Sequence, residues 1–240
     1  MLNKTSKAVR LATLGALAAG ALSVAPVANA EVEVAGSVSI ANMYLWRGND
    51  LGSGTAAVSG DIVVSTAGFY GGLWGSSGDS ASGTEYDIFV GFGGEAGDLS
   101  YDIMAINYMY PSLDDSYDNF ANFSEVILTL GFGPVSFSYY DNVANKGGPD
   151  GYEYYTLGFS TGAYSATVGI HDYEESSGAE SGDAVHLDIS YAFNDNLSFT
   201  LSQVVDTPSR EFCSDPDNDN VYNSCDDDVK FVVSYSLPIQ

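Results

Sequence analysis

The feature that most constrains the fold is an alternation of apolar and polar residues that recurs in segments of about ten residues. In the stretch 184–193, Val, Leu, Ile, Tyr and Phe hold the odd positions, and Ala, His, Asp and Ser hold the even ones. The stretches 126–132, 164–171, 197–205 and 229–237 repeat this pattern. A period of two places the two sets on opposite faces of a β-strand, so the sequence predicts an all-β protein.

The connections between these segments alternate between short and long. The short ones are 67–68, 95–98, 133–134, 162–163 and 194–196; the long ones are 48–54, 77–84, 111–122, 143–151, 174–183 and 206–228. The first strands are expected at 38–47 and 55–66. This rhythm predicts an antiparallel transmembrane β-barrel of about 12 strands, with short periplasmic turns and longer extracellular loops. A soluble, exported β-sandwich would also show the alternation and is the rival fold.

The first residues have the pattern of a secretory signal peptide. Lys4, Lys7 and Arg10 precede an apolar stretch at 11–24, and Ala28-Asn29-Ala30 forms a cleavage site of small residues. We therefore expect residues 1–30 to be removed and residues 31–240 to form one barrel domain. No later apolar run approaches the ~20 residues of a transmembrane helix. The expected location is the outer membrane of a Gram-negative bacterium.

Aromatic residues make up 13% of the chain and gather near the ends of the segments. Those beside the short turns are Phe69, Tyr70, Phe92, Tyr101, Phe132, Phe137, Phe159, Tyr164, Phe193 and Phe199. Those near the long loops are Tyr44, Trp46, Trp74, Tyr108, Tyr110, Phe123, Tyr139, Tyr140, Tyr152, Tyr154 and Tyr173. Two such bands predict the girdles at the two interfaces of a membrane, although aromatic residues also favour strands in general.

The charge is strongly acidic, with 32 Asp and Glu against 7 Lys and Arg, and a net charge of -25. Nucleic-acid binding depends on basic residues that neutralise phosphates, so the sequence excludes that role. The expected partners are outer-membrane lipid and lipopolysaccharide, the machinery that inserts barrels, and small solutes or cations.

Several short motifs carry a resemblance to a known family. They are Tyr44-x-x-Arg47-Gly48, Phe69-Tyr70-x-Gly72-x-Trp74-x-Ser76, Tyr101-Asp102, Tyr108-x-Tyr110-Pro111, Glu125, Gly133-Pro134-Val135 and Tyr139-Tyr140. In their order and spacing they resemble the TorF-type porin family as far as about Tyr154. The resemblance implies a bacterial outer-membrane barrel that forms a pore, and it implies no substrate. The chain departs from the usual barrel pattern because it does not end on an aromatic residue.

If the apolar sets face lipid, the opposite sets line the lumen. The charged candidates for this lining are Arg47, Asp61, Glu85, Asp87, Asp102, Glu125, Asp188 and Lys230. Because acids outnumber bases, we expect a narrow porin-like channel that prefers cations or carries small neutral solutes. A lumen plugged by side chains, with Arg47 neutralising carboxylates, is the alternative. The corresponding function is a non-conducting structural or surface barrel, such as an adhesin or a protein that binds divalent cations.

Two groups of residues are candidate metal ligands. His171 and His186 share the inward parity with Asp188, which fits a zinc site, a pH gate or a plain polar pair in the lumen. In loop 206–228, Asp215, Asp217, Asp219 and Asp226 have the spacing of a calcium loop, although Asn220 replaces the usual glycine. A Ca²⁺ ion bound within 213–226 and a solvated acidic loop both fit this stretch.

The chain has two cysteines, Cys213 and Cys225, both in this last loop. In an exported protein, such a pair predicts a disulfide that closes the loop. Catalytic motifs are lacking: no phosphate loop, metalloprotease helix or nucleophile elbow occurs in the sequence. We therefore expect that the protein is not an enzyme.

Overall fold

A computed structural model describes residues 31–113, 120–146, 151–173, 182–207 and 225–239, and this part of the chain is built from strands alone. The strands are β1 (Glu33–Ala41), β2 (Leu45–Trp46), β3 (Asn49–Asp50), β4 (Ala57–Thr66), β5 (Phe69–Asp79), β6 (Gly83–Ala96), β7 (Leu99–Met109), β8 (Phe123–Phe132), β9 (Val135–Asn145), β10 (Tyr152–Thr161), β11 (Tyr164–Tyr173), β12 (Gly182–Ala192), β13 (Leu197–Asp206) and β14 (Lys230–Ile239). Within these ranges, no helix is long and apolar enough to cross a membrane.

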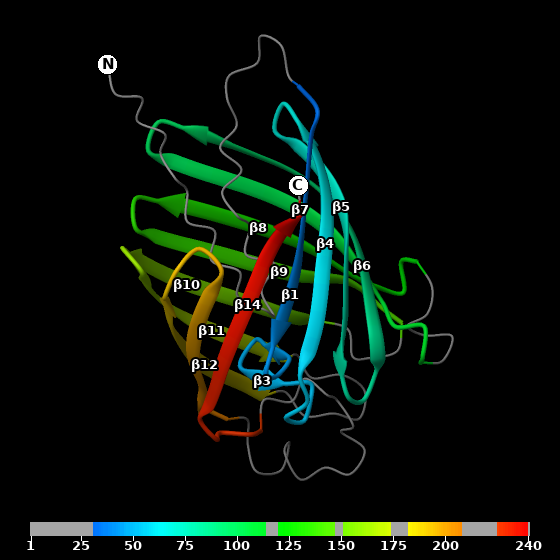
Figure 1. The fold of residues 1–240 in the computed structure, drawn as a ribbon, viewed down its shortest axis with the longest axis vertical. Helices are drawn as coiled ribbons and strands as arrows, with labels where there is room; N and C mark the ends of the chain where they lie inside the picture. Colours follow the sequence, from blue (N-terminus) through cyan, green and yellow to red (C-terminus); the bar gives the residue numbers. More distant parts are fainter. Residues whose placement is uncertain (1–30, 114–119, 147–150, 174–181, 208–224, 240) are drawn as a thin grey trace.

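Twelve of the strands form one closed antiparallel barrel (Figure 1). Each strand from β4 to β14 pairs with its neighbour in sequence, and β1 closes the ring by pairing with β4 on one side and β14 on the other. The predicted all-β antiparallel barrel of about 12 strands is therefore confirmed. Closure leaves no unpaired strand edge, so the ladder hydrogen bonds run around the whole ring.

The short turns all lie at one end of the barrel, which we call the short-turn end. Gly133 and Gly162 each begin a two-residue turn with positive φ, of 56° and 59°, which glycine adopts without a Cβ clash.

One connection at the opposite end, the long-loop end, is shorter than predicted. β5 continues as far as Asp79 and β6 begins at Gly83, so the expected loop 77–84 is reduced to residues 80–82. The Asp79 carboxylate accepts hydrogen bonds from the N–H groups of Ala81 and Ser82, which holds this tight turn.

The prediction of a first strand at 38–47 was wrong. The wall strand β1 ends at Ala41, and the chain then forms the separate hairpin of β2 and β3. Arg47 and Gly48 make the turn of this hairpin with φ of 47° and 84°. Left-handed residues cannot continue an extended strand, so residues 47 and 48 cannot belong to the wall strand, which has already ended at Ala41. Figure 1 shows this hairpin in blue within the lower end of the ring.

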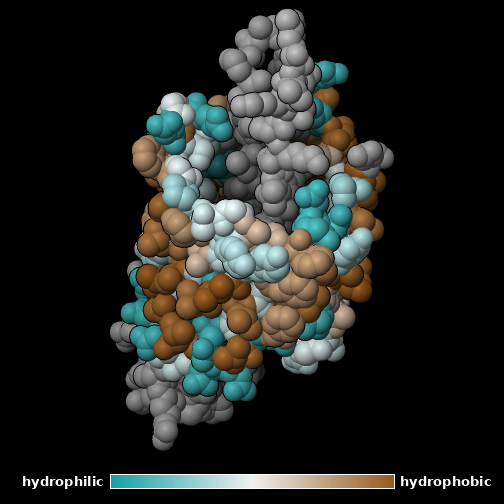
Figure 2. All heavy atoms as spheres, turned by 60° about the vertical axis from the view of Figure 1, so that its left-hand side comes forward, coloured by the Kyte–Doolittle hydropathy of each residue, from teal (hydrophilic) through white to brown (hydrophobic). Residues whose placement is uncertain are grey.

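The outer surface of the barrel is apolar. Each wall strand contributes at least one exposed large apolar side chain, and we call the following set the apolar belt: Val38, Ile62, Leu73, Val90, Ile103, Leu128, Phe137, Leu157, Val168, Ile189, Leu201 and Phe231. In Figure 2, hydrophobic side chains cover much of the outer wall. The alternate, inward positions hold polar and charged residues together with a buried set of aromatic and aliphatic side chains. A surface of this kind is the reverse of the one on soluble proteins, which rarely expose large continuous apolar patches.

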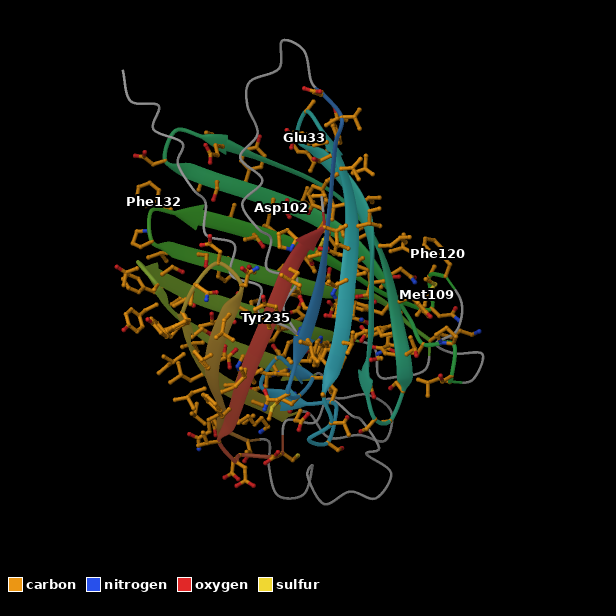
Figure 3. All side chains as sticks on the ribbon, viewed as in Figure 1. Glu33, Asp102, Met109, Phe120, Phe132 and Tyr235 are labelled. Atoms are coloured by element: carbon orange, nitrogen blue, oxygen red, sulfur yellow. The ribbon has the colours of Figure 1, made fainter. Side chains whose placement is uncertain are left out.

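The outward position of the aromatic residues beside the short turns is confirmed except at Tyr70, which faces the lumen and donates to Asp102. Phe69 and Phe92 stack across β5 and β6 with ring centroids 4.7 Å apart, and Tyr164 and Tyr191 meet across β11 and β12 at 5.0 Å. Phe132 lies at the end of β8 (Figure 3) and is 63% exposed, and Phe69 is 62% exposed. These rings face outward beside the turns, as a membrane girdle would.

The predicted band at the long-loop end was largely wrong. Most of its members face inward and are buried: Tyr44, Trp46, Tyr108, Tyr110, Phe123, Tyr140, Tyr152 and Tyr154. They share the inward parity of their strands, which the aromatic character of the side chains does not reveal. The outward aromatic residues at this end include Tyr86 and Tyr139. The inward aromatic set, together with the β2–β3 hairpin, fills this half of the lumen.

Candidate functional site in the barrel interior

The predicted lumen residues all point into the barrel interior. Arg47, Glu85, Asp87, Glu125, His171, His186 and Lys230 are buried, and Asp61, Asp102 and Asp188 are half-buried. Arg47 reaches this position from the turn of the β2–β3 hairpin and not from a wall strand. The alternation in sequence therefore identified the inward residues, while their grouping depends on the hairpin.

The β2–β3 hairpin lies against the inner surface of β11 and β12. Trp46 lies beside His171 of β11 with ring centroids 6.4 Å apart, whereas Leu45 packs with Val232 of β14. At Gly48 an added Cβ would come within 2.7 Å of the His186 Cβ, so only glycine permits this approach. The hairpin is thus packed directly on the wall.

Arg47 and Glu125 form a two-pronged ion pair in this interior. The Arg47 Nη1 and Nη2 atoms donate to Glu125 Oε1 at 3.0 Å and to Oε2 at 2.6 Å. Tyr108 donates to the same carboxylate at 2.8 Å, and Arg47 Nη1 also donates to the Tyr152 hydroxyl at 3.1 Å. Paired hydrogen bonds of this geometry are among the strongest between side chains. Both groups are almost completely removed from water, so each depends on the other to offset desolvation.

Aromatic rings enclose the guanidinium group. Its Cζ lies 4.4 Å from the Trp46 ring centroid and 4.5 Å from those of Tyr140 and Tyr154. The electron-rich faces of these rings attract a cation, and the attraction is strongest where water is excluded. The inward aromatic set therefore stabilises the charge that the hairpin carries into the barrel.

His171 makes a hydrogen bond with the main-chain carbonyl group of Arg47. Its Nε2 lies 2.9 Å from the Arg47 carbonyl oxygen, and its Nδ1 lies 2.9 Å from the Tyr152 hydroxyl. A carbonyl oxygen can only accept, so Nε2 must carry the proton and Nδ1 must accept from Tyr152. Tyr152 in turn accepts from Arg47. The contacts form a closed ring of hydrogen bonds that fixes both the side chain and the backbone of Arg47.

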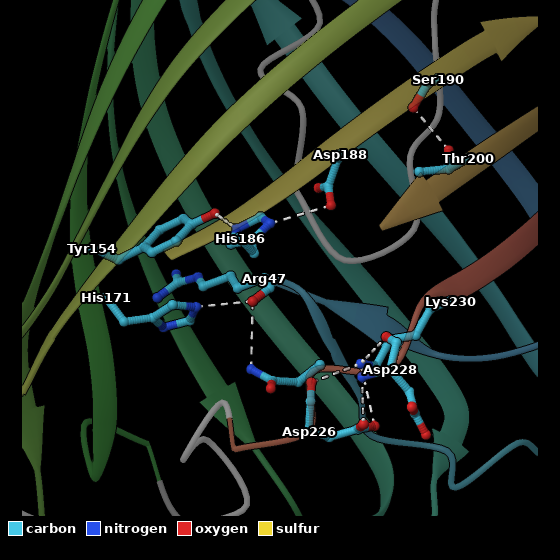
Figure 4. Close-up of polar contacts among 11 residues, drawn as sticks. Arg47, Tyr154, His171, His186, Asp188, Ser190, Thr200, Asp226, Asp228 and Lys230 are labelled. Atoms are coloured by element: carbon cyan, nitrogen blue, oxygen red, sulfur yellow. Dashed lines mark hydrogen bonds and ion pairs between the residues drawn. The ribbon is translucent and has the colours of Figure 1, made fainter. Parts of the chain in front are cut away.

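His186 makes a parallel set of contacts (Figure 4). Its Nε2 lies 2.7 Å from the Tyr154 hydroxyl and its Nδ1 lies 3.2 Å from Asp188 Oδ1. Gly169 leaves room for the ring, since an added Cβ would clash with Nε2 of His186. The two imidazoles are close, with ring centroids 5.8 Å apart, but all four ring nitrogens already have hydrogen-bond partners. These positions favour the polar-pair interpretation of His171 and His186 over zinc ligation.

A second group of carboxyls lies on β5 and β6. Tyr44 donates to Glu85 Oε2 at 2.5 Å, and Glu85 also has side-chain hydrogen bonds with Tyr110 and Asp87. Asp79 lies close enough to Glu85 to act on it electrostatically. Glu85 and Asp87 are therefore two neighbouring carboxyl groups, both almost completely removed from water.

Lys230 is separate from these groups. Its Nζ donates to the carbonyl oxygens of Asp226 and Asp228 and lies 3.2 Å from Asp226 Oδ2. Partial burial disfavours ionisation of Asp226, but the Asp228 N–H and the Lys230 ammonium outweigh it and lower the pKa of the Asp226 carboxyl. Asp226 is therefore an anion paired with a lysine in this structure.

The remaining calcium candidates, Asp215, Asp217 and Asp219, lie outside the described residues, as does Cys213. The disulfide to Cys225 and a Ca²⁺ ion in loop 213–226 stay predictions. Among the described residues, no group of three or more His, Cys, Asp or Glu could hold a metal ion.

The half of the lumen toward the short-turn end is lined differently. Small hydroxyl residues pair across strands there: Ser190 with Thr200 at 2.8 Å and Thr129 with Ser138 at 3.0 Å. Asp102 in this half accepts a hydrogen bond from Tyr70 at 2.9 Å. The small hydroxyl side chains occupy less space than those of the inward aromatic set.

The sequence interpretation missed the tyrosines as site residues. Tyr108, Tyr152 and Tyr154 bind the central charged groups through their hydroxyls. A usable signal was present, because Tyr152 and Tyr154 have the parity of Thr156 and Gly158 and not that of Leu157 and Phe159. An aromatic residue on the polar face of a strand indicates an interior contact.

These features define the class of protein: a closed antiparallel barrel with an apolar exterior and a charged, partly filled interior. A family model described as a bacterial protein of unknown function (Gcw_chp) matches residues 25–237. The match covers most of the chain, and the chain belongs to this family. A comparison with curated proteins found no match.

We expect Glu125→Gln to destabilise the barrel by about 3–5 kcal/mol, because it leaves the Arg47 charge buried without its counter-ion. Urea unfolding of the detergent-refolded protein would measure the change. Asp98→Asn is the matched control, because Asp98 is exposed in the turn between β6 and β7. Equal stability of the Glu125→Gln and Asp98→Asn proteins would show that the ion pair does not support the interior.

Proposed function

We propose that the protein is an outer-membrane barrel of a Gram-negative bacterium that forms a narrow, porin-like channel. The observation that carries this proposal is the reversal of surface chemistry: the apolar belt faces outward around the ring, and charged and hydroxyl side chains face inward. Lipid would solvate the belt, while water and solutes would occupy the lumen. The likeness of its motifs to TorF-type porins agrees with this proposal.

A row of acidic residues supports the position of the membrane boundary. Asp141, Glu153, Asp172 and Asp183 are direct partners across β9 to β12 on the outward face near the long-loop end. Glu153 accepts hydrogen bonds from the outward hydroxyls of Tyr139 and Tyr155. Carboxylates are costly in hydrocarbon and tyrosines favour the interface, so this row would lie at the headgroups, with lipopolysaccharide as a neighbour.

The expected solutes follow from the charge of the lumen. Asp61, Glu85, Asp87, Asp102, Glu125 and Asp188 face Arg47 and Lys230, so acids outnumber bases inside. We propose that the channel prefers cations or passes small neutral solutes, with its constriction at the β2–β3 hairpin. This role involves no catalysis.

A non-conducting structural or surface barrel is the second candidate. The buried Arg47–Glu125 pair and its aromatic surroundings favour it, because they fill one half of the lumen. In this case the acidic loops at the long-loop end would carry the function, by binding divalent cations or a surface partner.

Planar-bilayer recording across a KCl gradient would separate the two candidates. We expect discrete conductance steps and a reversal potential that indicates cation preference. Replacing the half-buried lumen carboxylates in Asp102→Asn/Asp188→Asn should move the reversal potential toward zero, while Asp98→Asn in an exposed turn should not. Silence from a barrel that still shows heat-modifiable migration would reject the channel and favour the surface protein.

A second prediction concerns the membrane itself. Leu157 lies in the middle of β10 and is 57% exposed in the apolar belt. Leu157→Lys should destabilise the barrel in lipid vesicles by about 2–4 kcal/mol, as a lysine does near the bilayer midplane. Ser160→Lys, on the inward parity of the same strand, is the control and should cost less. Equal unfolding free energies for the two variants would contradict burial of the belt in lipid.

A further inference from the structure

Carboxylates and aromatic rings alternate in one row across four neighbouring strands of the lumen. Asp61 on β4 is the direct partner of Trp74 on β5, Trp74 is the partner of Asp87 on β6, and Asp87 is the partner of Tyr108 on β7. Direct partners on adjacent strands point to the same face of a sheet. Asp87 and Tyr108 are buried in the interior, so the whole row faces inward.

Both carboxylates of this row have an oxygen that is not satisfied. Asp87 is only 2% exposed, and its Oδ1 has no hydrogen-bond partner among the described residues. The Oδ1 atom of Asp61 is likewise buried and unbonded within the described part of the chain. A buried polar atom without a partner costs about 1–3 kcal/mol, and more if it is charged. These two oxygens point to a ligand that compensates them, by its positive charge or by a hydrogen bond.

Within the described residues, no side chain supplies a cation to the row. Arg47 and Lys230 are the buried basic residues of the described chain, and they are engaged with Glu125 and Asp226. Glu85 and Glu125 act electrostatically on Asp87 and make its surroundings more negative. A ligand that fits the row must therefore be positively charged.

The ligands that the row offers argue against a bare metal ion. Asp61 and Asp87 are two strands apart, which corresponds to about 9–10 Å across a sheet. Ca²⁺ takes about six to eight oxygen ligands, whereas the row offers two carboxylates and an indole, and no group of three or more His, Cys, Asp or Glu among the described residues could hold a metal ion. The indole of Trp74 lies between them, and an aromatic face attracts organic ammonium groups.

We propose that Asp61, Trp74 and Asp87 form a binding site for a small organic ammonium ion. The cation lies over the Trp74 ring and interacts with the carboxylates on either side. Asp61 and Trp74 are half-buried, so the ligand enters from the lumen, while Asp87 forms the buried end of the site. The site deepens the proposed channel function, because it names a class of solute. Binding at the site does not itself require that ions cross the membrane.

Isothermal titration calorimetry of the refolded barrel in detergent tests this site, with choline chloride as the probe. The control ligand is 3,3-dimethylbutan-1-ol, which has nearly the same shape without the charge. We expect saturable binding of choline and none of the alcohol. A titration of sodium chloride at matched ionic strength corrects for non-specific effects of salt.

Three variants assign the binding to the row. Asp61→Asn and Asp61→Asn/Asp87→Asn should each weaken choline binding by at least about tenfold, and Trp74→Leu by about threefold to tenfold. Trp74→Phe should restore part of the affinity because it keeps an aromatic face. Asp102→Asn is the matched control, since Asp102 is a half-buried lumen carboxylate that lies outside the row and is bonded to Tyr70.

Two results would overturn the site: equal binding of the alcohol, or wild-type affinity in a folded Asp61→Asn protein. Absence of saturable choline binding to the folded wild type would also overturn it. Asp61→Asn changes a half-buried residue, so it keeps the test valid if the double variant does not fold. Choline binding without conductance steps would reject the channel and retain the site, and conductance without choline binding would do the reverse.

Discussion

The ion pair between Arg47 and Glu125 is the interaction on which the interior depends. A closed barrel with a period of two directs all its polar side chains into one confined space, where charges must satisfy one another. Arg47 does this for Glu125 with two hydrogen bonds, while Tyr152 and His171 hold its side chain and its carbonyl group. The hairpin of β2 and β3 is thereby fixed inside the ring, and the inward aromatic side chains at the long-loop end pack around its arginine.

This arrangement divides the lumen into two parts with different chemistry. The half at the long-loop end is packed around a charged centre, whereas the half at the short-turn end is lined by Ser and Thr that pair across strands. The row of Asp61, Trp74 and Asp87 begins with two half-buried residues and ends with a carboxylate that is buried in the interior.

The fold could be predicted from sequence because its determinants are local. Alternation within each strand and turn residues between strands define the inside, the outside and the number of crossings. The same alternation identified Glu85, Asp87 and Glu125 as inward residues. It failed at Arg47, which is inward but on a hairpin, because the left-handed turn at Arg47 and Gly48 is not visible in a hydrophobic pattern.

The contacts that build the site depend on register between strands, which parity alone does not provide. Asp61, Trp74 and Asp87 come from separate strands, and only the pairing of β4, β5 and β6 makes them neighbours. Tyr152 and Tyr154 were assigned to a membrane girdle because a tyrosine suits both an interface and a buried contact with a hydroxyl partner. Their burial depends on contacts with Arg47, which lies 105 positions before Tyr152 in the sequence.

The central claim is that one face of each strand meets lipid and the other meets the lumen. Adjacent residues Thr156 and Leu157 on β10 provide the most direct test, because they point to opposite faces. A fluorophore would be attached to a single cysteine at either position in protein with Cys213 and Cys225 changed to serine, reconstituted in lipid vesicles. The account predicts quenching by brominated lipid at 157 and much weaker quenching at 156. Equal quenching at both positions, or quenching at 157 only by a water-soluble agent, would contradict it.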